Sequence, residues 1–253
     1  MILTGVKTHK ITQKDKDILK ILDRYVKKLS ENSVVAVASK IVAITEGRFV
    51  KIGSFDKDQL VKQEAELYLP RSMSKYDFCI SVKYNMLIAS AGIDESNGNG
   101  YYILWPQDPQ KSANIIRGYL ARKFKLRNVG VIITDSKLSP LRWGVTGYAV
   151  SHSGFEALNS YIGKPDIFGR KLKVEKLSIS DSLATAAVAV MGEGEEQTPI
   201  AVIEDVPFVK FQKRNPTKKE LTDLHINIGD DIFAPFLKQV KWRKGRGGKN
   251  NFY

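Results

Sequence analysis

The sequence predicts an α+β fold, because strand-like and helix-like segments follow one another without strict alternation. Apolar runs rich in β-branched residues occur at 34–38 and 129–134, and amphipathic runs typical of helices lie between and after them. A doubly wound sheet would require a helix after almost every strand. The 253 residues, 43% of them hydrophobic, suffice for one large domain or two small ones.

The first half of the chain contains five predicted elements: helices at 11–29 and 56–68, a buried strand at 33–43, and a hairpin of strands at 77–83 and 86–90. Thr12 can cap the first helix, and Ile18 and Leu22 fall on its apolar face. The buried strand is interrupted by Ser39-Lys40. Tyr84-Asn85 is the predicted turn of the hairpin.

The second half of the chain contains eight predicted elements: strands at 128–134, 145–150, 172–178 and 200–203, and helices at 108–124, 179–191, 217–224 and 231–240. The amino-acid composition changes at Val206-Pro207, which predicts a catalytic domain at 1–206 and a basic C-terminal extension at 207–253. Within the extension, residues 241–249 are rich in Gly, Lys and Arg, so this segment is expected to be flexible.

The formal charge of +13 favours anionic partners such as nucleotides, polycarboxylates or nucleic acid. One hypothesis is therefore a nucleic-acid-binding protein that uses the basic extension to contact phosphates. No known nucleic-acid motif supports it, and few aromatic residues accompany the basic ones. Nucleic acid is thus an unlikely partner by this reasoning, and small anions are favoured.

The single cysteine, Cys79, excludes an intrachain disulfide and lies in an apolar run, so core packing is its expected role. The sequence lacks a secretory signal pattern at its first residues and an apolar run of about 18 residues. These observations predict a cytoplasmic protein with no membrane contact.

Two aspartates follow directly on apolar runs, at the expected rim of a core. Asp94 comes after 87–93, and Asp135 comes after 129–134 with the hydroxyl of Ser136 next to it. Turn formation alone explains either aspartate. Two together favour a site for a hard cation such as Mg²⁺, which takes oxygen ligands and relieves repulsion between carboxylates. A metal held in this way points to chemistry on a phosphate.

Other candidate residues surround these aspartates in the sequence. The segment Gly192-Glu193-Gly194 ends a predicted helix, where glycine is common, but residues 192–196 also carry three acids in a basic protein. Ser39 and Lys40 end a buried strand, and Lys40 is either a cation that reaches a phosphate or an exposed loop lysine. Arg142 precedes a Gly-Val-Thr-Gly segment where backbone can approach a ligand closely. The P-loop, the Rossmann glycine pattern and zinc-ligand spacing are all missing from the sequence.

Seven segments together resemble the coenzyme F420-0:γ-glutamyl ligase family, in the same order and with similar spacing from about residue 33 to residue 203. These segments are 35–42, 46–48, 91–97, 129–136, 142–147, 163–170 and 191–194. The resemblance implies an α+β mixed-sheet fold and an interlocked homodimer. It also implies a GTP-dependent ligase that joins L-glutamate by an amide bond to a carboxylate-bearing acceptor, with F420-0 as the acceptor of the family.

The resemblance also implies roles for individual residues. Two divalent cations, Mg²⁺ or Mn²⁺, would be held by Asp94, Asp135, Ser136 and Glu193, with K⁺ as a further candidate. The nucleotide would contact Ser39, Lys40, Asn97, Gly192, Glu193 and Gly194. Lys40 and Arg142 are the candidate catalytic cations. The sequence leaves open whether the acceptor is F420-0 or a folate-type or other γ-glutamyl carrier, and whether GTP or ATP is used.

Overall fold

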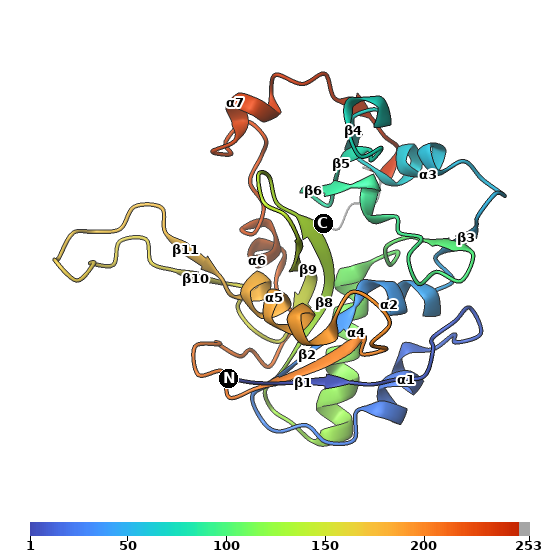
Figure 1. Ribbon diagram of the computed structural model, residues 1–253. Helices are drawn as coiled ribbons and strands as arrows, with labels where there is room; N and C mark the ends of the chain where they lie inside the picture. Colours follow the sequence, from blue (N-terminus) through green and yellow to red (C-terminus); the bar gives the residue numbers. More distant parts are fainter. Residues whose placement is uncertain (248–253) are drawn as a thin grey trace.

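The computed structural model describes residues 1–247, and a mixed five-stranded sheet forms its centre (Figure 1). The strand order is β1 (Ile2–Val6), β12 (Ile200–Glu204), β2 (Ser33–Ala38), β8 (Val129–Leu138) and β9 (Val145–Ser153). Strands β2 and β8 are parallel, and the other three pairs are antiparallel. The predicted α+β class is therefore confirmed.

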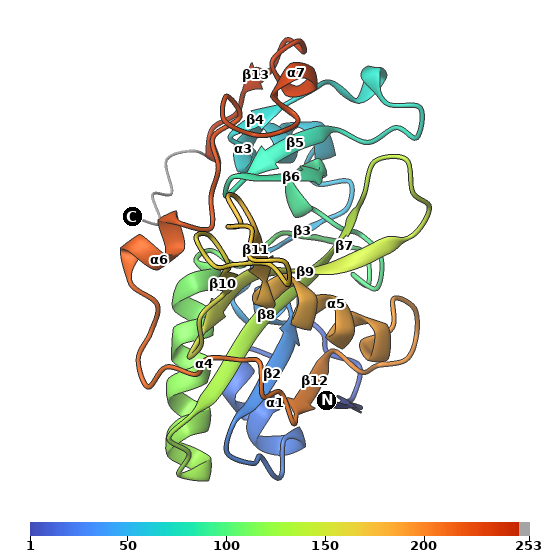
Figure 2. The same cartoon turned by 90° about the vertical axis from the view of Figure 1, so that its left-hand side faces the viewer.

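Helices cover both faces of this sheet: α1 (Ile18–Tyr25) and α4 (Pro109–Phe124) lie on one face, and α5 (Ile179–Met191) lies on the other (Figure 2). Successive residues of a strand point to opposite faces, and β2 is apolar on both. Val35 and Val37 pack in the core beneath α1 and α4. Val34 and Ala36 pack in the core beneath α5. This double burial explains why β2 reads as a continuous apolar run.

A smaller lobe stands above one end of the central sheet (Figure 1). Its elements are α3 (Lys57–Glu64), η1 (Arg71–Met73), η2 (Ser90–Gly92) and a sheet of β13 (Arg243–Lys244), β4 (Leu67–Tyr68), β5 (Ile80–Lys83) and β6 (Met86–Ala89). The β5–β6 hairpin confirms the predicted hairpin, and its turn residues Tyr84 and Asn85 have φ of 50° and 57°. The short pair β3 (Phe49–Lys51) and β7 (Tyr101–Ile103) connects this lobe to the central sheet.

Two further segments extend from the core. Strands β10 (Leu158–Ser160) and β11 (Lys176–Ser178) form the base of an arm, residues 158–178, that projects from the molecule (Figure 1). The C-terminal segment contains α6 (Lys218–Thr222) and α7 (Ala234–Leu237). Val209 packs in the core under α5, and β13 pairs with β4. The C-terminal segment thus contacts both the central core and the smaller lobe.

Several sequence predictions are confirmed closely and others need correction. The helices at 108–124 and 179–191 match α4 and α5 almost residue for residue. The strand predicted at 33–43 is wrong after Ala38, because residues 39–45 form the helix α2 (Ser39–Thr45). A short run that is apolar on every side fits a buried helix as well as a buried strand, so periodicity cannot separate them.

The other corrections concern where elements begin and end. The helix predicted at 11–29 is shorter, since Asp17 rather than Thr12 caps it and the chain is extended from Val26. The helix predicted at 56–68 ends at Glu64, where Leu67–Tyr68 pairs with β5 instead. The predicted flexible segment 241–249 includes the strand β13, and its last two residues lie outside the described residues.

The prediction for Cys79 is confirmed, because this residue is only 2% exposed in the core of the smaller lobe. Its Sγ lies 3.7 Å from Oδ1 of Asp58, and burial raises the pKa of the thiol. A buried thiol with a raised pKa is a poor nucleophile. In the part of the chain that the structure describes, no helix is long and apolar enough to cross a membrane.

Candidate active site

The parallel pairing of β2 with β8 brings four candidate residues together, namely Ser39, Lys40, Asp135 and Ser136. Ala38 is the register partner of Thr134, so the residues that follow them, Ser39 at the start of α2 and Asp135 within β8, lie next to each other where the parallel pairing ends. The register of β8 with β9 shifts between Ile133 and Thr134, a bulge of the kind that redirects side chains near sites. Lys40 and Ser136, the next residue of each segment, are thereby placed near the same point.

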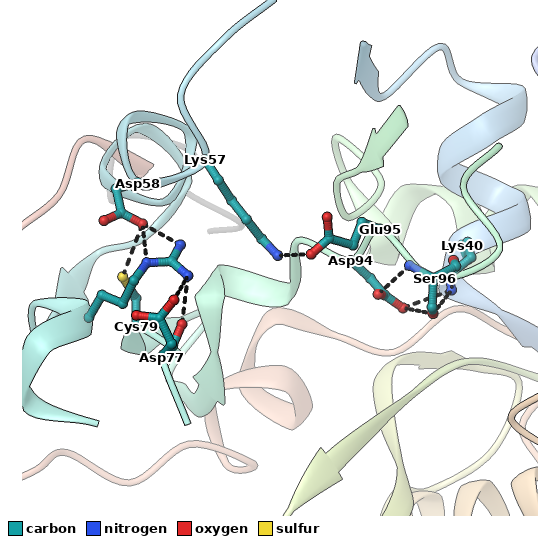
Figure 3. A network of polar contacts seen from close by, with 9 residues as sticks. Lys40, Lys57, Asp58, Asp77, Cys79, Asp94, Glu95 and Ser96 are labelled. Carbon is teal, nitrogen blue, oxygen red and sulfur yellow. Dashed lines mark hydrogen bonds and ion pairs between the residues drawn. The ribbon is translucent and has the colours of Figure 1, made fainter. Parts of the chain in front are cut away.

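Lys40 connects the end of the β2–β8 pairing to the loop that carries Asp94 (Figure 3). The Lys40 ammonium donates to Oδ2 of Asp94 at 2.7 Å, and to the carbonyl and hydroxyl oxygens of Ser96 at 2.7 and 3.1 Å. Ser96 in turn donates its backbone N–H and its hydroxyl to the Asp94 carboxylate. Next to Asp94, Glu95 forms an ion pair of 2.9 Å with Lys57 of α3. The loop is therefore held from two sides.

The two aspartates differ in their electrostatic surroundings. Burial acts to raise the pKa of Asp94, but the Lys40 charge and the hydrogen bonds from Lys40 and Ser96 leave it below its ordinary value. Burial also raises the pKa of Asp135, and here the donors Ser136, Trp105 and Ser39 do not offset it. A carboxylate with a raised pKa gains more from a nearby cation than a carboxylate that already has one.

A further segment, residues 192–196 after α5, also contacts the site. Helix α5 ends at Gly192, whose φ of 77° suits glycine. The Ser136 hydroxyl donates to Oε1 of Glu193, and the side-chain amide of Asn97 donates to the carbonyl of Gly194 at 2.9 Å. Three segments far apart in the sequence therefore meet at one place.

The backbone before Asp94 is unusual. Ser90, Ala91 and Gly92 have φ of 49°, 54° and 74°, which is the left-handed region that non-glycine residues avoid. Such backbone costs of order 1 kcal/mol or more for each non-glycine residue, here Ser90 and Ala91, and is found preferentially at functional sites. Hydrogen bonds hold the turn, since Ala91 N–H donates to the Ser81 hydroxyl at 2.7 Å. This turn, which is η2 itself, leads the chain to Asp94.

The structure gathers most of the residues that the sequence singled out, but Gly192 and Arg142 take no part in these contacts. The residues joined by the contacts above are Ser39, Lys40, Asp94, Asn97, Asp135, Ser136, Glu193 and Gly194. Arg142 lies exposed in the turn between β8 and β9, and no hydrogen bond or ion pair joins its side chain to another of residues 1–247.

Sequence reasoning missed two residues at this place, Ser96 and Trp105. Ser96 lies within a segment rich in turn-forming residues, so nothing distinguished its hydroxyl from those of other turns. The indole N–H of Trp105 donates to Oδ2 of Asp135 at 2.5 Å. The available signal was a tryptophan at the end of the apolar run 102–105, because a buried indole needs an acceptor for its N–H.

The donor set at this site suits a hard cation. Carboxylates of Asp94, Asp135 and Glu193 and the hydroxyl of Ser136 are all oxygen donors, the type that Mg²⁺ and Mn²⁺ prefer. Within the described residues, no three or more His, Cys, Asp and Glu side chains lie close enough together to form a closed metal site. Lys40 instead supplies the positive charge at Asp94. The residue types therefore fit such a cation.

Comparison with known proteins identifies the family of this chain. The F420-0:Gamma-glutamyl ligase family matches residues 5–205. A coenzyme F420:L-glutamate ligase of Methanopyrus kandleri is 36% identical over 190 residues, which cover 69% of this chain and 75% of that protein. Proteins of the same name from Methanococcus maripaludis strain C7 and Methanocaldococcus jannaschii are 34% and 29% identical, and cover 82% and 79% of this chain. The matched parts make up 82% and 86% of those two proteins. The chain therefore belongs to the F420-0:gamma-glutamyl ligase family.

Proposed function

We propose that this protein is a GTP-dependent γ-glutamyl ligase that joins L-glutamate to coenzyme F420-0 through an amide bond. Family membership over residues 5–205 supports the reaction class, and the names of the relatives support the acceptor. The observation that carries the proposal is the meeting of Lys40, Asp94 and Asp135 where the parallel pairing of β2 with β8 ends. Cations and carboxylates gathered in this way suit chemistry on a phosphate.

A carboxylate resists attack by an amine, so the acceptor must first be activated. In the proposed reaction, an acceptor carboxylate oxygen attacks the γ-phosphorus of GTP, and the bond to the β-phosphate oxygen breaks to release GDP. The glutamate amine then attacks the carbonyl carbon of this acyl phosphate. The bond from that carbon to the phosphate oxygen breaks, phosphate leaves, and the nitrogen loses a proton to give the amide.

The residues of the site have distinct parts in this proposal. Lys40, which already contacts three oxygens, would stabilise negative charge on the transferred phosphoryl group. Arg142 would act on the same charge when its turn approaches the substrates. Contacts to the nucleotide would come from Ser39, Asn97 and the segment Gly192-Glu193-Gly194. Because nucleotide, acceptor and glutamate are all anions, holding them together accounts for much of the expected rate gain.

Two divalent cations, Mg²⁺ or Mn²⁺, belong to this proposal, with K⁺ as a further candidate. Asp94, Asp135, Ser136 and Glu193 would hold them. When bound, these cations would neutralise charge on the phosphate oxygens. The raised pKa of Asp135 supports this assignment, because this carboxylate is desolvated without a matching ion pair among the described residues.

The proposal also includes a homodimer, a cytoplasmic location, and a division of the chain into a catalytic part at 1–206 and an extension at 207–253. The exposed apolar residues of the arm support the homodimer, since Ile167 and Phe168 are 92% and 88% exposed. Val209 of the extension is buried under α5, so the extension is expected to stabilise the catalytic part. The cytoplasmic location rests on the single cysteine.

Mass spectrometry of candidate acceptors tests the proposal. The purified protein is incubated with L-glutamate, Mg²⁺ or Mn²⁺, and GTP or ATP, together with F420-0 or a reduced folate. A GTP-dependent gain of a glutamyl unit by F420-0 is expected. A gain by the folate alone would mean that a folate, and not F420-0, is the acceptor. No gain on any acceptor would remove the ligase assignment, and polynucleotide binding with and without residues 207–253 would then be measured.

A further inference from the structure

We propose that Trp105 is a positioning residue that fixes Asp94 and Asp135 relative to each other in the candidate site. The inference rests on the proposed function, because it concerns the two carboxylates assigned there to the metal. Trp105 belongs to none of the segments that carry the family resemblance. It is 1% exposed, and its indole lies against Asp135 and against Gly92 in the turn before Asp94.

The segment that ends at Trp105 holds one aspartate through its backbone and the other through its side chain. Ile103 and Asp94 exchange two backbone hydrogen bonds, of 2.7 and 3.0 Å. Two residues later, the indole N–H of Trp105 donates to Oδ2 of Asp135 at 2.5 Å. The distance between the aspartates therefore depends on the short stretch from Ile103 to Trp105.

The indole also packs directly against the turn that leads to Asp94. A Cβ atom added to Gly92 would lie 2.3 Å from Nε1 of Trp105 and 2.4 Å from its Cε2, far inside van der Waals contact. Glycine is therefore required at position 92 both by this contact and by its φ of 74°. The residue that donates to Asp135 thus also limits where the backbone before Asp94 can lie.

A set of contacts restrains the indole on its other sides. The Tyr84 ring stacks on it with centroids 5.7 Å apart, and the Lys83 ammonium lies 5.5 Å from its centroid. Glu64 accepts from both Lys83 and Arg48, at 2.6 and 2.7 Å. Arg48 also donates to the Trp105 carbonyl at 3.1 Å. Both the ring and the backbone of Trp105 are therefore anchored to the smaller lobe.

This arrangement has a measurable consequence. Partners that hydrogen-bond a ligating carboxylate orient it, and their loss commonly weakens metal binding by about 10- to 100-fold. Replacing Trp105 by Phe keeps an aromatic ring but removes the donor to Asp135. The variant Trp105→Phe is therefore expected to bind Mn²⁺ about 10- to 100-fold more weakly than the wild type. Trp242→Phe is the matched control, because it removes an indole N–H that donates to the Leu237 carbonyl at 2.8 Å.

A second pair of variants moves the indole without removing it. Gly92→Ala places a methyl group against Trp105, whereas Gly47→Ala introduces the same strain at an identical φ of 74° with no atom within 4 Å. Calorimetric titration with Mn²⁺ measures all four variants, and circular dichroism checks their folding. Weaker binding in Trp105→Phe and Gly92→Ala, with both controls within about twofold of the wild type, supports the inference. Wild-type affinity in folded Trp105→Phe would overturn it.

A measurement on the wild-type protein covers the case in which these variants fail to fold. The indole N–H resonances are recorded by NMR and assigned with Trp242→Phe and Trp143→Phe. Mn²⁺ should broaden the Trp105 resonance selectively, and an unbroadened Trp105 resonance in the Mn²⁺-bound protein would overturn the inference. Asp135→Asn separates the two claims: unchanged Mn²⁺ binding in that variant would remove the proposed metal site itself. Unchanged binding in Trp105→Phe alone would remove only the positioning role.

Discussion

At the scale of single residues, the ammonium of Lys40 lies where three oxygens converge, one from Asp94 and two from Ser96. A cation fixed in this way is already oriented before any substrate binds. It therefore needs little reorganisation to stabilise charge on a phosphoryl group. Lys40 also belongs to the first turn of α2, which starts directly at the end of β2, so the rigid sheet determines its position.

Replacing Lys40 by Met should lower turnover by about 100-fold or more, because one charged group that stabilises a transition state commonly contributes that much. Lys219→Met is a suitable control, since Lys219 forms an exposed ion pair of 2.8 Å with Asp223 in the C-terminal segment. Phosphate release under saturating substrates measures both variants. Wild-type turnover in Lys40→Met would exclude Lys40 from the chemistry.

The sequence predicts single residues of this site unevenly. Asp94 and Asp135 could be found because each follows an apolar run, which is visible locally, although Asp135 lies within β8 and Asp94 follows η2. Trp105 could not be found in this way, since its contact with Asp135 joins residues 30 positions apart. Hydrogen bonds across the fold depend on strand order and register, which the pattern of one chain does not contain.

At the scale of secondary structure, α3 and β5 are joined by a charged cluster inside the smaller lobe. Glu64 of α3 accepts hydrogen bonds from Lys83 of β5 and from Arg48, and Lys83 is almost completely buried. Burial acts to raise the pKa of Glu64, but the charges and hydrogen bonds of Lys83 and Arg48 leave it below its ordinary value. This carboxylate therefore stabilises the fold only while it is ionised.

Replacing Glu64 by Gln should lower the free energy of unfolding by about 3 kcal/mol at pH 7, because Lys83 then lacks a buried counter-charge. A carboxyl whose pKa falls on folding contributes stability above its unfolded pKa of about 4.3. That contribution is lost as the pH falls through the lower folded value. Urea unfolding at pH 7 and below pH 4 should show the difference from wild type shrinking on acidification.

The control for this change is Glu156→Gln, which breaks an exposed pair with Lys210 at 3.2 Å. It should change the free energy of unfolding by less than about 1 kcal/mol. A pH-independent loss in Glu64→Gln would contradict an ionised cluster.

Secondary structure was predictable where a segment had a clear period and a clear cap. Helix α4 has Asp108 at its N-cap and Pro109 in its first turn, and the predicted limits agree with it. Helix α2 has no side-chain cap, and its residues Ile41 to Ile44 are buried on every side. Without a polar face the sequence carries no helical period, so tertiary packing alone decides between helix and strand there.

At the scale of the whole molecule, the arm at 158–178 exposes several large apolar side chains to solvent. Besides Ile167 and Phe168, Val174 is also largely exposed. The arm extends away from the central sheet and the smaller lobe (Figure 1). An extended apolar segment of this kind suits insertion against a second copy of the chain.

The double variant Ile167→Asp/Phe168→Asp should convert the proposed dimer to a monomer, because two carboxylates would be buried without partners at the interface. Analytical ultracentrifugation at micromolar concentration measures the change. Ile232→Asp provides the control, since Ile232 is 86% exposed but lies outside the arm. An unchanged dimer in the double variant, or a monomeric wild type, would remove the arm from the proposed assembly.

The proposed reaction depends most on Asp94 and Asp135 acting together in γ-glutamyl ligation. Mass spectrometry should show GTP-dependent addition of glutamate to F420-0 by the wild type and by Asp23→Asn, whose aspartate pairs with Lys123 on the surface. Folded Asp94→Asn and Asp135→Asn should be at least about 100-fold slower. Near-wild-type addition by both variants would contradict the account.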